Sequence, residues 1–375
     1  MVRTDVAVIG VGAMGSMALW RLAGRGARAI GFEQFAPGHD RGSSHGESRI
    51  IRTAYFEGAA YVPLVRRAFS LWRDLEREAG TTLLTLTGAL MIGHPESAVV
   101  AGALASARQH GLAHTVLDAT AMAARFPQHT LAADEVAVYE EEAGLLRPEA
   151  AILAATARAE ALGATVLRQA RVERIEPDAD GVTIVAGGET YRARHAIVSA
   201  GAWLGALLPR AGLPLRVERQ VSHWCRVADP RSFAPDRFPV FIRELPGGRY
   251  RYGFPSLDGE TIKVGVHHEG ATVDPEQPDR KVGREDVEPI ASYIAACLRG
   301  VDPDPARSLT CMYTNTPDEH FAIGPLEGLP NLTLVSACSG HGFKFAPALG
   351  DLAADLALTG VTAQDIGIFS PARLR

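Results

Sequence analysis

The stretch from Val6 to Gly15 reads VAVIGVGAMG, an apolar run followed by three glycines in the pattern Gly-x-Gly-x-x-Gly. The β-branched run Val6–Ile9 is typical of a parallel strand that is buried on both faces. After Gly15 the apolar residues recur at helical spacing, and Gly26 is expected to end this helix. Strand, glycine turn and helix in this order predict the first unit of a doubly wound α/β domain.

The turn made by Gly10, Gly12 and Gly15 is expected to bind a pyrophosphate, because backbone N–H groups and the helix dipole attract anions there. The pattern alone is weak evidence in a chain with 38 glycines among 375 residues, so its position between strand and helix carries the prediction. Glu33 ends the next predicted strand, where a carboxylate accepts hydrogen bonds from an adenosine ribose and repels a 2′-phosphate. We therefore expect FAD or NAD, between which the turn does not decide. Leu19 departs from the usual pattern, because small residues are frequent at its helix position.

The composition is that of a globular protein, with 47% hydrophobic residues, 22% charged residues and a formal net charge of −5. This acidic balance and the absence of a Lys/Arg cluster argue against nucleic acid as a partner. The uncharged stretch from Val6 to Trp20 is interrupted by glycines and is shorter than the roughly 20 residues of a membrane span. We expect a cytoplasmic protein that does not cross a membrane.

The four cysteines, Cys225, Cys297, Cys311 and Cys338, are too few in 375 residues for a disulfide framework. None forms a Cys-x-x-Cys pair, so no structural zinc or other metal site is expected. Both observations favour a reducing compartment.

Further along the chain, helical and strand patterns alternate. Proline or glycine marks an end of most predicted helices, which are Pro63–Glu78, Ala101–His110, Pro148–Leu162 and Ala346–Leu358. Strands are predicted at Thr85–Ile92, Val166–Ile175, Val182–Val185, His195–Gly201 and Leu332–Ala337. Residues 39–52 read as too irregular for a strand, and residues 215–300 read as strand-rich.

Five sequence blocks follow one another from residue 42 onward. They are GSSHG (42–46) with RIIR (49–52), YGFP (252–255), CMYT (311–314), PDEHF (317–321) and SGHGFKF (339–345). In this order the blocks resemble the family of monomeric sarcosine oxidase, N-methyltryptophan oxidase and pipecolate oxidase, and the likeness runs nearly end to end. The family consists of FAD-containing amine oxidases of the glutathione-reductase-like, D-amino-acid-oxidase class.

The resemblance implies an α/β fold with two domains. A Rossmann-like FAD-binding domain would be discontinuous, made of residues 1–82, 141–215 and 301–375. A mixed-sheet substrate domain, made of residues 83–140 and 216–300, would cover the substrate over the flavin.

Two groups of residues follow from the resemblance at the reaction centre. Arg52 and Lys344 match the residues that hold the substrate carboxylate, a role that suits an Arg fork and a Lys point charge. Lys263 matches the lysine that lies over the flavin and activates O2, where a cation stabilises the developing anion. Further catalytic or pocket residues that the resemblance places around the ring are His45, Arg49, Tyr252, His267 and Tyr313. Ser44 stands where the family more often has histidine.

Cys311 matches the cysteine that links to the flavin 8α-methyl group through a thioether, a reaction that needs a thiolate. Taken alone, a single cysteine is more often an inert buried residue. The cofactor-binding residues implied altogether are Gly10, Gly12, Gly15, Glu33, Ser43, Val172, Cys311, Gly340, Gly342, Phe343 and Lys344.

The implied reaction is the oxidation of a secondary or N-methyl amino acid, such as sarcosine, N-methyltryptophan or a pipecolate- or proline-like compound, to an imine with reduction of O2 to H2O2. Its partners would be this small molecule and O2, and the family name suggests a monomer. Three alternatives stay open: an FAD-dependent dehydrogenase with another electron acceptor, an NAD-dependent dehydrogenase, and a non-catalytic flavoprotein. Phe56 lies either near the carboxylate site or in the core.

Overall fold

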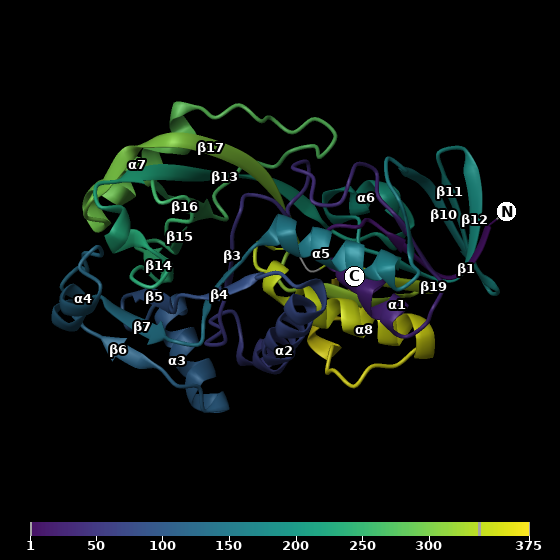
Figure 1. Cartoon of the computed structure of the whole chain (residues 1–375), viewed down its shortest axis with the longest axis horizontal. Helices are drawn as coiled ribbons and strands as arrows, with labels where there is room; N and C mark the ends of the chain where they lie inside the picture. Colours follow the sequence, from purple (N-terminus) through teal and green to yellow (C-terminus); the bar gives the residue numbers. More distant parts are fainter. Residues whose placement is uncertain (1, 337–338, 375) are drawn as a thin grey trace.

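The computed structural model describes residues 2–336 and 339–374, and its two large sheets lie side by side along the long axis of the molecule (Figure 1). The first sheet has the strand order β10-β11-β12-β1-β2-β9, with β19 paired to β12 and β18 paired to β19. Its strands are β1 (Val2–Ile9), β2 (Ala29–Phe32), β9 (Thr165–Leu167), β10 (Val172–Asp178), β11 (Gly181–Ala186), β12 (Glu189–Val198), β18 (Ala322–Leu326) and β19 (Leu329–Ser336).

The central strand β1 lies parallel to β2 on one side and to β12 on the other. Its side chains alternate between two apolar clusters, with Val6 and Val8 in one and Ala7 and Ile9 in the other. The strand is therefore buried on both faces, which confirms the prediction from its β-branched composition.

Four helices form a layer against the first sheet: α1 (Ala13–Gly24), α2 (Val62–Ala79), α5 (Pro148–Ala161) and α8 (Ala346–Thr359). Helix α1 packs against both α5 and α8. Helices α2 and α8 end at Gly80 and Gly360, which adopt left-handed conformations with φ of 63° and 76°. The predicted helices at these positions are confirmed with shifts of one or two residues at their ends.

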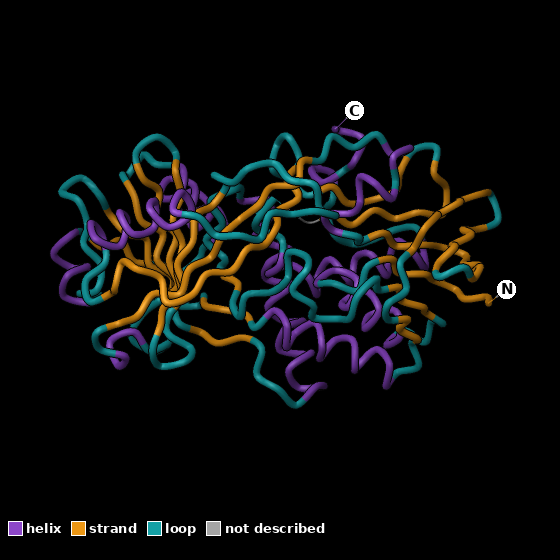
Figure 2. Tube along the Cα trace, turned by 90° about the horizontal axis from the view of Figure 1, so that it is seen from above, coloured by secondary structure: helices purple, strands orange, loops and turns teal. Residues whose placement is uncertain are grey.

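The second sheet has the order β17-β13-β16-β15-β14-β5-β7-β6. Its strands are β5 (Ala89–Gly93), β6 (Thr115–Leu117), β7 (Val136–Glu140), β13 (Arg216–Val227), β14 (Val240–Leu245), β15 (Arg249–Phe254), β16 (Thr261–His267) and β17 (Val301–Asn315). Helices α3 (Ala98–His110), α4 (Ala119–Arg125) and α7 (Arg284–Cys297) lie in this half. Seen from above, these strands gather at the end of the molecule opposite the N-terminus (Figure 2).

A small sheet, β3-β8-β4, joins the two halves and consists of β3 (Arg49–Ile51), β4 (Leu84–Leu86) and β8 (Gly144–Leu146). The remaining elements are α6 (Leu204–Leu207) and the short 3₁₀ helices Ala59–Tyr61, Gly201–Trp203, Pro209–Ala211, Pro230–Phe233, Phe343–Phe345, Gly367–Phe369 and Pro371–Leu374.

The structure corrects three local predictions. Residues 39–52 do contain a strand, β3, because Arg49–Ile51 pair with the distant strand β8. The strand-rich region 215–300 contains helix α7, whose apolar pattern is interrupted by Pro289. The strand expected at Val166–Ile175 is two strands, β9 and β10, that lie at opposite edges of the first sheet.

The domain division stays a prediction, and the sheets differ from it at two strands. Strand β17 lies within residues 301–375 of the predicted FAD-binding domain, yet it pairs with β13 in the second sheet. Strand β4 lies within residues 83–140 of the predicted substrate domain, yet it pairs with β8 in the small sheet. Cys338, and Ala337 at the end of the predicted last strand, lie outside the described residues.

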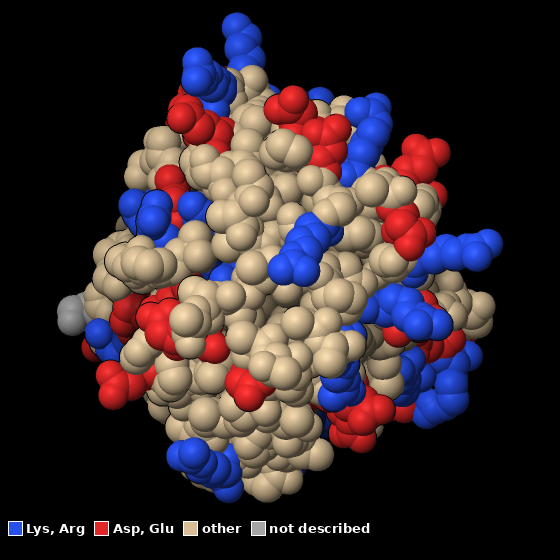
Figure 3. Space-filling model, turned by 90° about the vertical axis from the view of Figure 1, so that its left-hand side faces the viewer, with Lys and Arg blue, Asp and Glu red and all other residues tan. Residues whose placement is uncertain are grey.

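The end of the molecule formed by the second sheet carries acidic and basic side chains interspersed, without a large area of one sign (Figure 3). Over residues 2–336 and 339–374, no helix combines the length and apolar character that a membrane crossing requires.

Candidate active site

One cavity of about 440 Å³ is lined by residues of both sheets. Gly10, Gly12 and Glu33, which follow strands β1 and β2 of the first sheet, contribute to its wall, and so do Lys263 and Cys311 of the second sheet. The predicted nucleotide turn and the predicted reaction centre therefore share one space.

The glycine turn has the close backbone packing that requires its residue types. A Cβ atom on Gly15 would lie 1.8 Å from the Gly10 carbonyl oxygen, and one on Gly10 would lie 2.7 Å from the Ser199 carbonyl oxygen. Gly12, the N-cap of α1, has nothing within 4 Å of its Cβ position. The turn thus leaves free space in front of the first helical N–H groups, as a bound pyrophosphate requires.

Glu33 is buried at the end of β2 and faces this turn. Its carboxylate accepts hydrogen bonds from the Val11 N–H at 3.0 Å and the Phe35 N–H at 2.9 Å, while His39 lies 3.5 Å away. The acid fixes the turn and also lines the cavity.

Leu19, the departure noted in the sequence, is compensated within the sheet. A Cβ atom on Gly31 of β2 would lie 2.5 Å from Leu19 Cδ1. The glycine in the neighbouring strand therefore provides the room that a small helix residue would otherwise supply.

Arg52 directly follows β3, at the start of the loop, and is buried with 1% of its surface exposed. Its Nη1 donates to the Ala54 carbonyl at 2.9 Å, and its Nη2 donates to Glu57 Oε2 at 2.5 Å. The guanidinium lies 4.4 Å from the ring centroids of both Tyr55 and Phe56. Its Nε has no hydrogen-bond partner in the described part of the chain, so one buried donor is free for a ligand.

Lys344 is the second cation of this region. Its Nζ donates to the His341 carbonyl at 2.7 Å and lies 5.1 Å from the centre of the Tyr55 ring. Burial, and then the neighbouring Arg52, lowers the pKa of Lys344 to about 7. Tyr55 therefore contacts both cations that are predicted to bind a carboxylate.

His341 holds Tyr55 in this position. Its Nε2 lies 3.0 Å from the Glu319 carbonyl, which can only accept, so Nε2 carries the proton and Nδ1 accepts from the Tyr55 hydroxyl at 2.5 Å. Burial lowers the pKa of His341 to about 4, which keeps the ring neutral near pH 7.

Lys263 lies in the middle of β16 and is 4% exposed. Its Nζ donates to the carbonyls of Gly46 at 2.7 Å and Ser48 at 3.1 Å. Burial, followed by the charge of Arg49, lowers the pKa of Lys263 well below that of a free lysine. Because Lys263 is buried and hydrogen-bonded within the protein, its amine does not point to bulk water.

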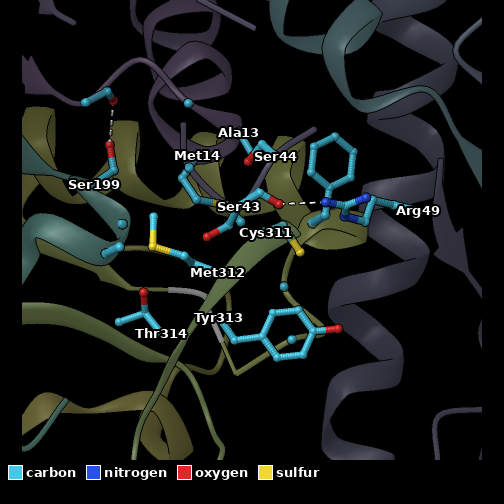
Figure 4. Close-up of a pocket in the computed structure, with 18 of the residues that line it drawn as sticks. Ala13, Met14, Ser43, Ser44, Arg49, Ser199, Cys311, Met312, Tyr313 and Thr314 are labelled. Carbon is cyan, nitrogen blue, oxygen red and sulfur yellow. Dashed lines mark hydrogen bonds between the residues drawn. The ribbon is translucent and has the colours of Figure 1, made fainter. Parts of the chain in front are cut away.

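Cys311 lines the cavity near the end of β17, close to Arg49 and Ser43 (Figure 4). It is a free cysteine, and burial raises the pKa of its thiol, although the positive charges of Arg49 and Lys263 act in the opposite direction. Arg49 donates to the Ser43 carbonyl at 2.6 Å and to the Ser48 carbonyl at 2.7 Å.

The predicted aromatic and histidine side chains form a connected wall. The Tyr252 hydroxyl lies 3.1 Å from Ser222 Oγ, and His267 Nδ1 lies 3.2 Å from the Tyr313 hydroxyl. A Cβ atom on Gly340 would lie 2.5 Å from the Tyr313 ring, so only glycine fits there. Burial lowers the pKa of His267 well below its usual value.

Most predicted site residues line the same cavity, namely Gly10, Gly12, Glu33, Ser43, Arg49, Arg52, Val172, Tyr252, Lys263, His267, Cys311, Tyr313, Gly340, Gly342, Phe343 and Lys344. Two lie behind its wall. Gly15 packs beneath Gly10, and His45 is buried with neither ring nitrogen hydrogen-bonded within the described residues.

The residues of the cavity fit FAD better than a smaller group. An open glycine turn and Glu33 suit the adenosine diphosphate part, and the wall continues through Val172 and Ser43 to Cys311. Over the described ranges, no three His, Cys, Asp or Glu side chains are grouped so that they could hold a metal ion.

The sequence left the placement of Phe56 open between the carboxylate site and the core. Phe56 lines the cavity beside Arg52 and stacks on Tyr250 with a centroid distance of 6.2 Å and an interplanar angle of 16°. Two contributors, Glu57 and Glu149, were not identified from the sequence. Glu57 follows Arg52 by only five positions, and in a loop this spacing is a weak sequence signal for an ion pair. Glu149 lies far in sequence from the loop at Gly46 that it contacts, so no local pattern indicates it.

Comparison with known proteins extends these observations to the whole chain. The family described as DAO, FAD-dependent oxidoreductase, matches residues 5–356. The monomeric sarcosine oxidase of Streptomyces avermitilis is 44% identical over 99% of this chain and 97% of its own length. The N-methyl-L-tryptophan oxidase of Salmonella arizonae is 36% identical over 98% of either chain.

A solved structure is also similar from end to end. The open form of NikD, described as an unusual amino acid oxidase essential for nikkomycin biosynthesis, superposes with a TM-score of 0.88 at 26% identity, covering 99% of this chain and 98% of NikD. This likeness confirms the expected mixed α/β fold.

Proposed function

The chain belongs to the family of FAD-dependent oxidoreductases, and on that premise we propose that it oxidises a secondary or N-methyl amino acid to an imine, with O2 as the electron acceptor. The relatives named as sarcosine oxidase and N-methyl-L-tryptophan oxidase support this substrate class. FAD, when bound, supplies the two-electron acceptor that O2 later reoxidises.

One observation carries the proposal. Two buried cations, Arg52 and Lys344, line the same cavity as the glycine turn and Lys263. Glu57 balances only one of these two charges. A substrate carboxylate is the natural partner for the other, because an unpaired buried charge is costly and Arg52 keeps a free Nε donor.

Each side chain has a defined task in this proposal. Arg52 and Lys344 bind the substrate carboxylate and so orient the C–H bond that is broken. Tyr252, His267 and Tyr313 form the wall of the substrate site and exclude water. Lys263 provides positive charge where O2 is reduced, which stabilises the developing anion.

The overall chemistry balances as two electrons and two protons. The amine loses one hydride equivalent from carbon and one proton from nitrogen, forming C=N. O2 gains both electrons and two protons to give H2O2, and the imine then reacts with water.

We also propose that FAD is attached covalently through Cys311. The position of this thiol on the cavity wall supports the assignment. Burial raises the pKa of the thiol, and the nearby charges of Arg49 and Lys263 partly offset this effect. The contacts of FAD with Ser43, Val172 and the Gly340–Lys344 turn are part of the same proposal.

The proposal also includes a cytoplasmic location and a monomeric state for the protein. Free Cys225, Cys297 and Cys311 are consistent with a reducing, cytoplasmic compartment. The relatives named as monomeric support a monomer.

The experiment is an H2O2-coupled assay of the purified yellow protein with sarcosine, N-methyl-L-tryptophan, L-pipecolate and L-proline. Arg52→Gln is the test variant, and Arg174→Gln, which changes an exposed arginine, is the control. We expect H2O2 with at least one compound and a loss of about 100-fold or more in kcat/KM for Arg52→Gln only.

Two results would contradict the proposal. Reduction of an artificial acceptor without H2O2 would identify a dehydrogenase instead. Bound FAD that is bleached by none of these compounds would identify a non-catalytic flavoprotein.

A further inference from the structure

Glu149 holds the loop on which the amine of Lys263 is anchored. Its Oε1 accepts hydrogen bonds from the backbone N–H groups of Gly46 at 2.6 Å and Glu47 at 3.1 Å. The carbonyls of Gly46 and Ser48 in this loop are the acceptors of Lys263 Nζ. One carboxylate and one amine therefore bind the same three-residue segment, the carboxylate through its N–H groups and the amine through its carbonyls.

Strand pairing explains how Glu149 reaches a residue about 100 positions earlier. In the small sheet, Arg49 pairs with Leu146 and Ile50 pairs with Leu145 in antiparallel register. Continuing this register backward from Arg49 and forward from Leu146 brings residue 149 opposite residue 46. Glu149 lies in the first turn of α5, directly after that strand.

The loop needs such an anchor because its backbone is unusual. Gly46 and Glu47 have successive positive φ values of 94° and 69°. For a non-glycine residue such as Glu47, this left-handed conformation is strained. Without the two bonds to Glu149, the segment would be expected to relax toward negative φ, which would turn the Gly46 carbonyl away.

A second group of contacts fixes the same loop from the other half of the molecule. The Glu47 carboxylate accepts a hydrogen bond from Trp224 Nε1 at 3.0 Å and forms an ion pair with Arg307. Trp224 is the direct cross-strand neighbour of Lys263. The loop is thus the point where the two halves meet around this lysine.

We propose that Glu149 is a positioning residue for Lys263: by binding the Gly46 and Glu47 N–H groups, it sets the carbonyl acceptors that hold the Lys263 amine toward the cavity. The inference rests on the proposed role of Lys263 in the reaction with O2. Glu149 does not line the cavity, yet in this proposal it controls the half-reaction with O2.

Charge adds a second effect in the same direction. The negative charges of Glu149 and Glu47 favour the protonated form of Lys263, against burial and Arg49, which disfavour it. Glu149→Gln keeps an oxygen acceptor and removes the charge, whereas Glu149→Ala removes both. The two variants therefore separate geometry from charge.

The test measures the two half-reactions separately and adds a structural readout. Anaerobic mixing with substrate gives the rate of flavin reduction, and mixing of the reduced enzyme with O2 gives the rate of reoxidation. Crystal structures of the variants give the distances from Lys263 Nζ to the Gly46 and Ser48 carbonyls. Lys263→Met is the reference variant, and Glu160→Ala, at the far end of α5 in an exposed ion pair with Arg168, is the control.

For Glu149→Ala we expect reoxidation to slow about tenfold or more, with reduction changed less than about threefold. In its crystal structure Lys263 Nζ would no longer reach both carbonyls. Glu149→Gln should keep the amine in place and reoxidise within about threefold of wild type near pH 7. Its reoxidation rate should decline at a lower pH than in the wild type, because Lys263 loses its proton more readily.

Other outcomes would contradict either the positioning role of Glu149 or the proposed role of Lys263. If Lys263→Met reoxidises slowly but Glu149→Ala does not, or if both half-reactions of Glu149→Ala fall equally, the positioning role is wrong. If Lys263→Met reoxidises like wild type, the proposed role of Lys263 itself fails. Should Glu149→Ala not fold, Glu149→Asp, whose shorter side chain withdraws the acceptor, decides the question by the same measurements.

Discussion

Arg52 and Glu57 form an ion pair of 2.5 Å inside the cavity that is proposed to bind the substrate carboxylate. Burial opposes ionisation of Glu57, but the positive charge of Arg52, with that of Lys344, outweighs it and lowers the pKa of this carboxyl below its usual value. Glu57 therefore stays charged and occupies one arm of the arginine that a substrate must use.

The ion pair predicts that Glu57 competes with the substrate. Glu57→Gln should release the Arg52 arm and remove a negative charge, so the Kd of a small carboxylic acid should fall roughly fivefold, equivalent to about 1 kcal/mol. Titration of the flavin absorbance at about pH 6, where Lys344 is protonated, measures this Kd. Weaker binding would show instead that Glu57 holds Arg52 in its productive position.

Lys344 predicts a pH dependence of carboxylate binding. Because its pKa is about 7, Lys344 is fully protonated at lower pH and loses its positive charge as the pH rises through this value. Binding of a carboxylate without an amine should therefore weaken above about pH 7, by up to tenfold per pH unit. Lys344→Met should bind weakly at all pH values with a flatter profile. A wild-type Kd that is constant from about pH 6 to 9 would contradict this account.

The close packing at Gly15 predicts that a side chain at this position disrupts the cofactor turn. In Gly15→Ala the new Cβ would lie 1.8 Å from the Gly10 carbonyl oxygen, so the turn must open. We expect protein with little or no FAD and a lower Tm. Gly24→Ala is the matched control, because nothing lies within 4 Å of its Cβ position near the end of the same helix. Full FAD content in Gly15→Ala would show that the turn does not bind the cofactor.

The proposed covalent bond to Cys311 predicts that the flavin stays with the protein when the protein is denatured. After precipitation with acid, the yellow colour should remain in the pellet for the wild type and move to the supernatant for Cys311→Ser. Cys225→Ser, which removes a buried cysteine of the second sheet, should behave like wild type. A yellow supernatant from the wild type would leave a flavoprotein without the covalent bond.

The parts of the fold that depend on local pattern were predictable. Val6–Ile9 and the amphipathic helix α2 carry their signal within a few consecutive residues. Strand β3 does not, because Arg49–Ile51 becomes a strand only through pairing with β8. Helix α7 was missed because Pro289 stands inside it.

The same distinction applies to the site. Arg52, Lys263, Cys311 and Lys344 were named through a resemblance and were then found on one cavity. Glu149 lies far in sequence from the loop that it holds, so only the register of β3 and β8 reveals it.

The central claim is that the protein removes two electrons from an N-methyl or secondary amino acid and passes them to O2. The most direct measurement follows the flavin absorbance of the purified protein on anaerobic addition of sarcosine, or of the best compound in the panel, and then on admission of air. We predict bleaching without air, full recovery of the yellow colour with air, and one H2O2 formed for each flavin reoxidised. A flavin that bleaches but stays reduced in air would contradict the oxidase account, and one that no amino acid of this class bleaches would contradict the substrate class.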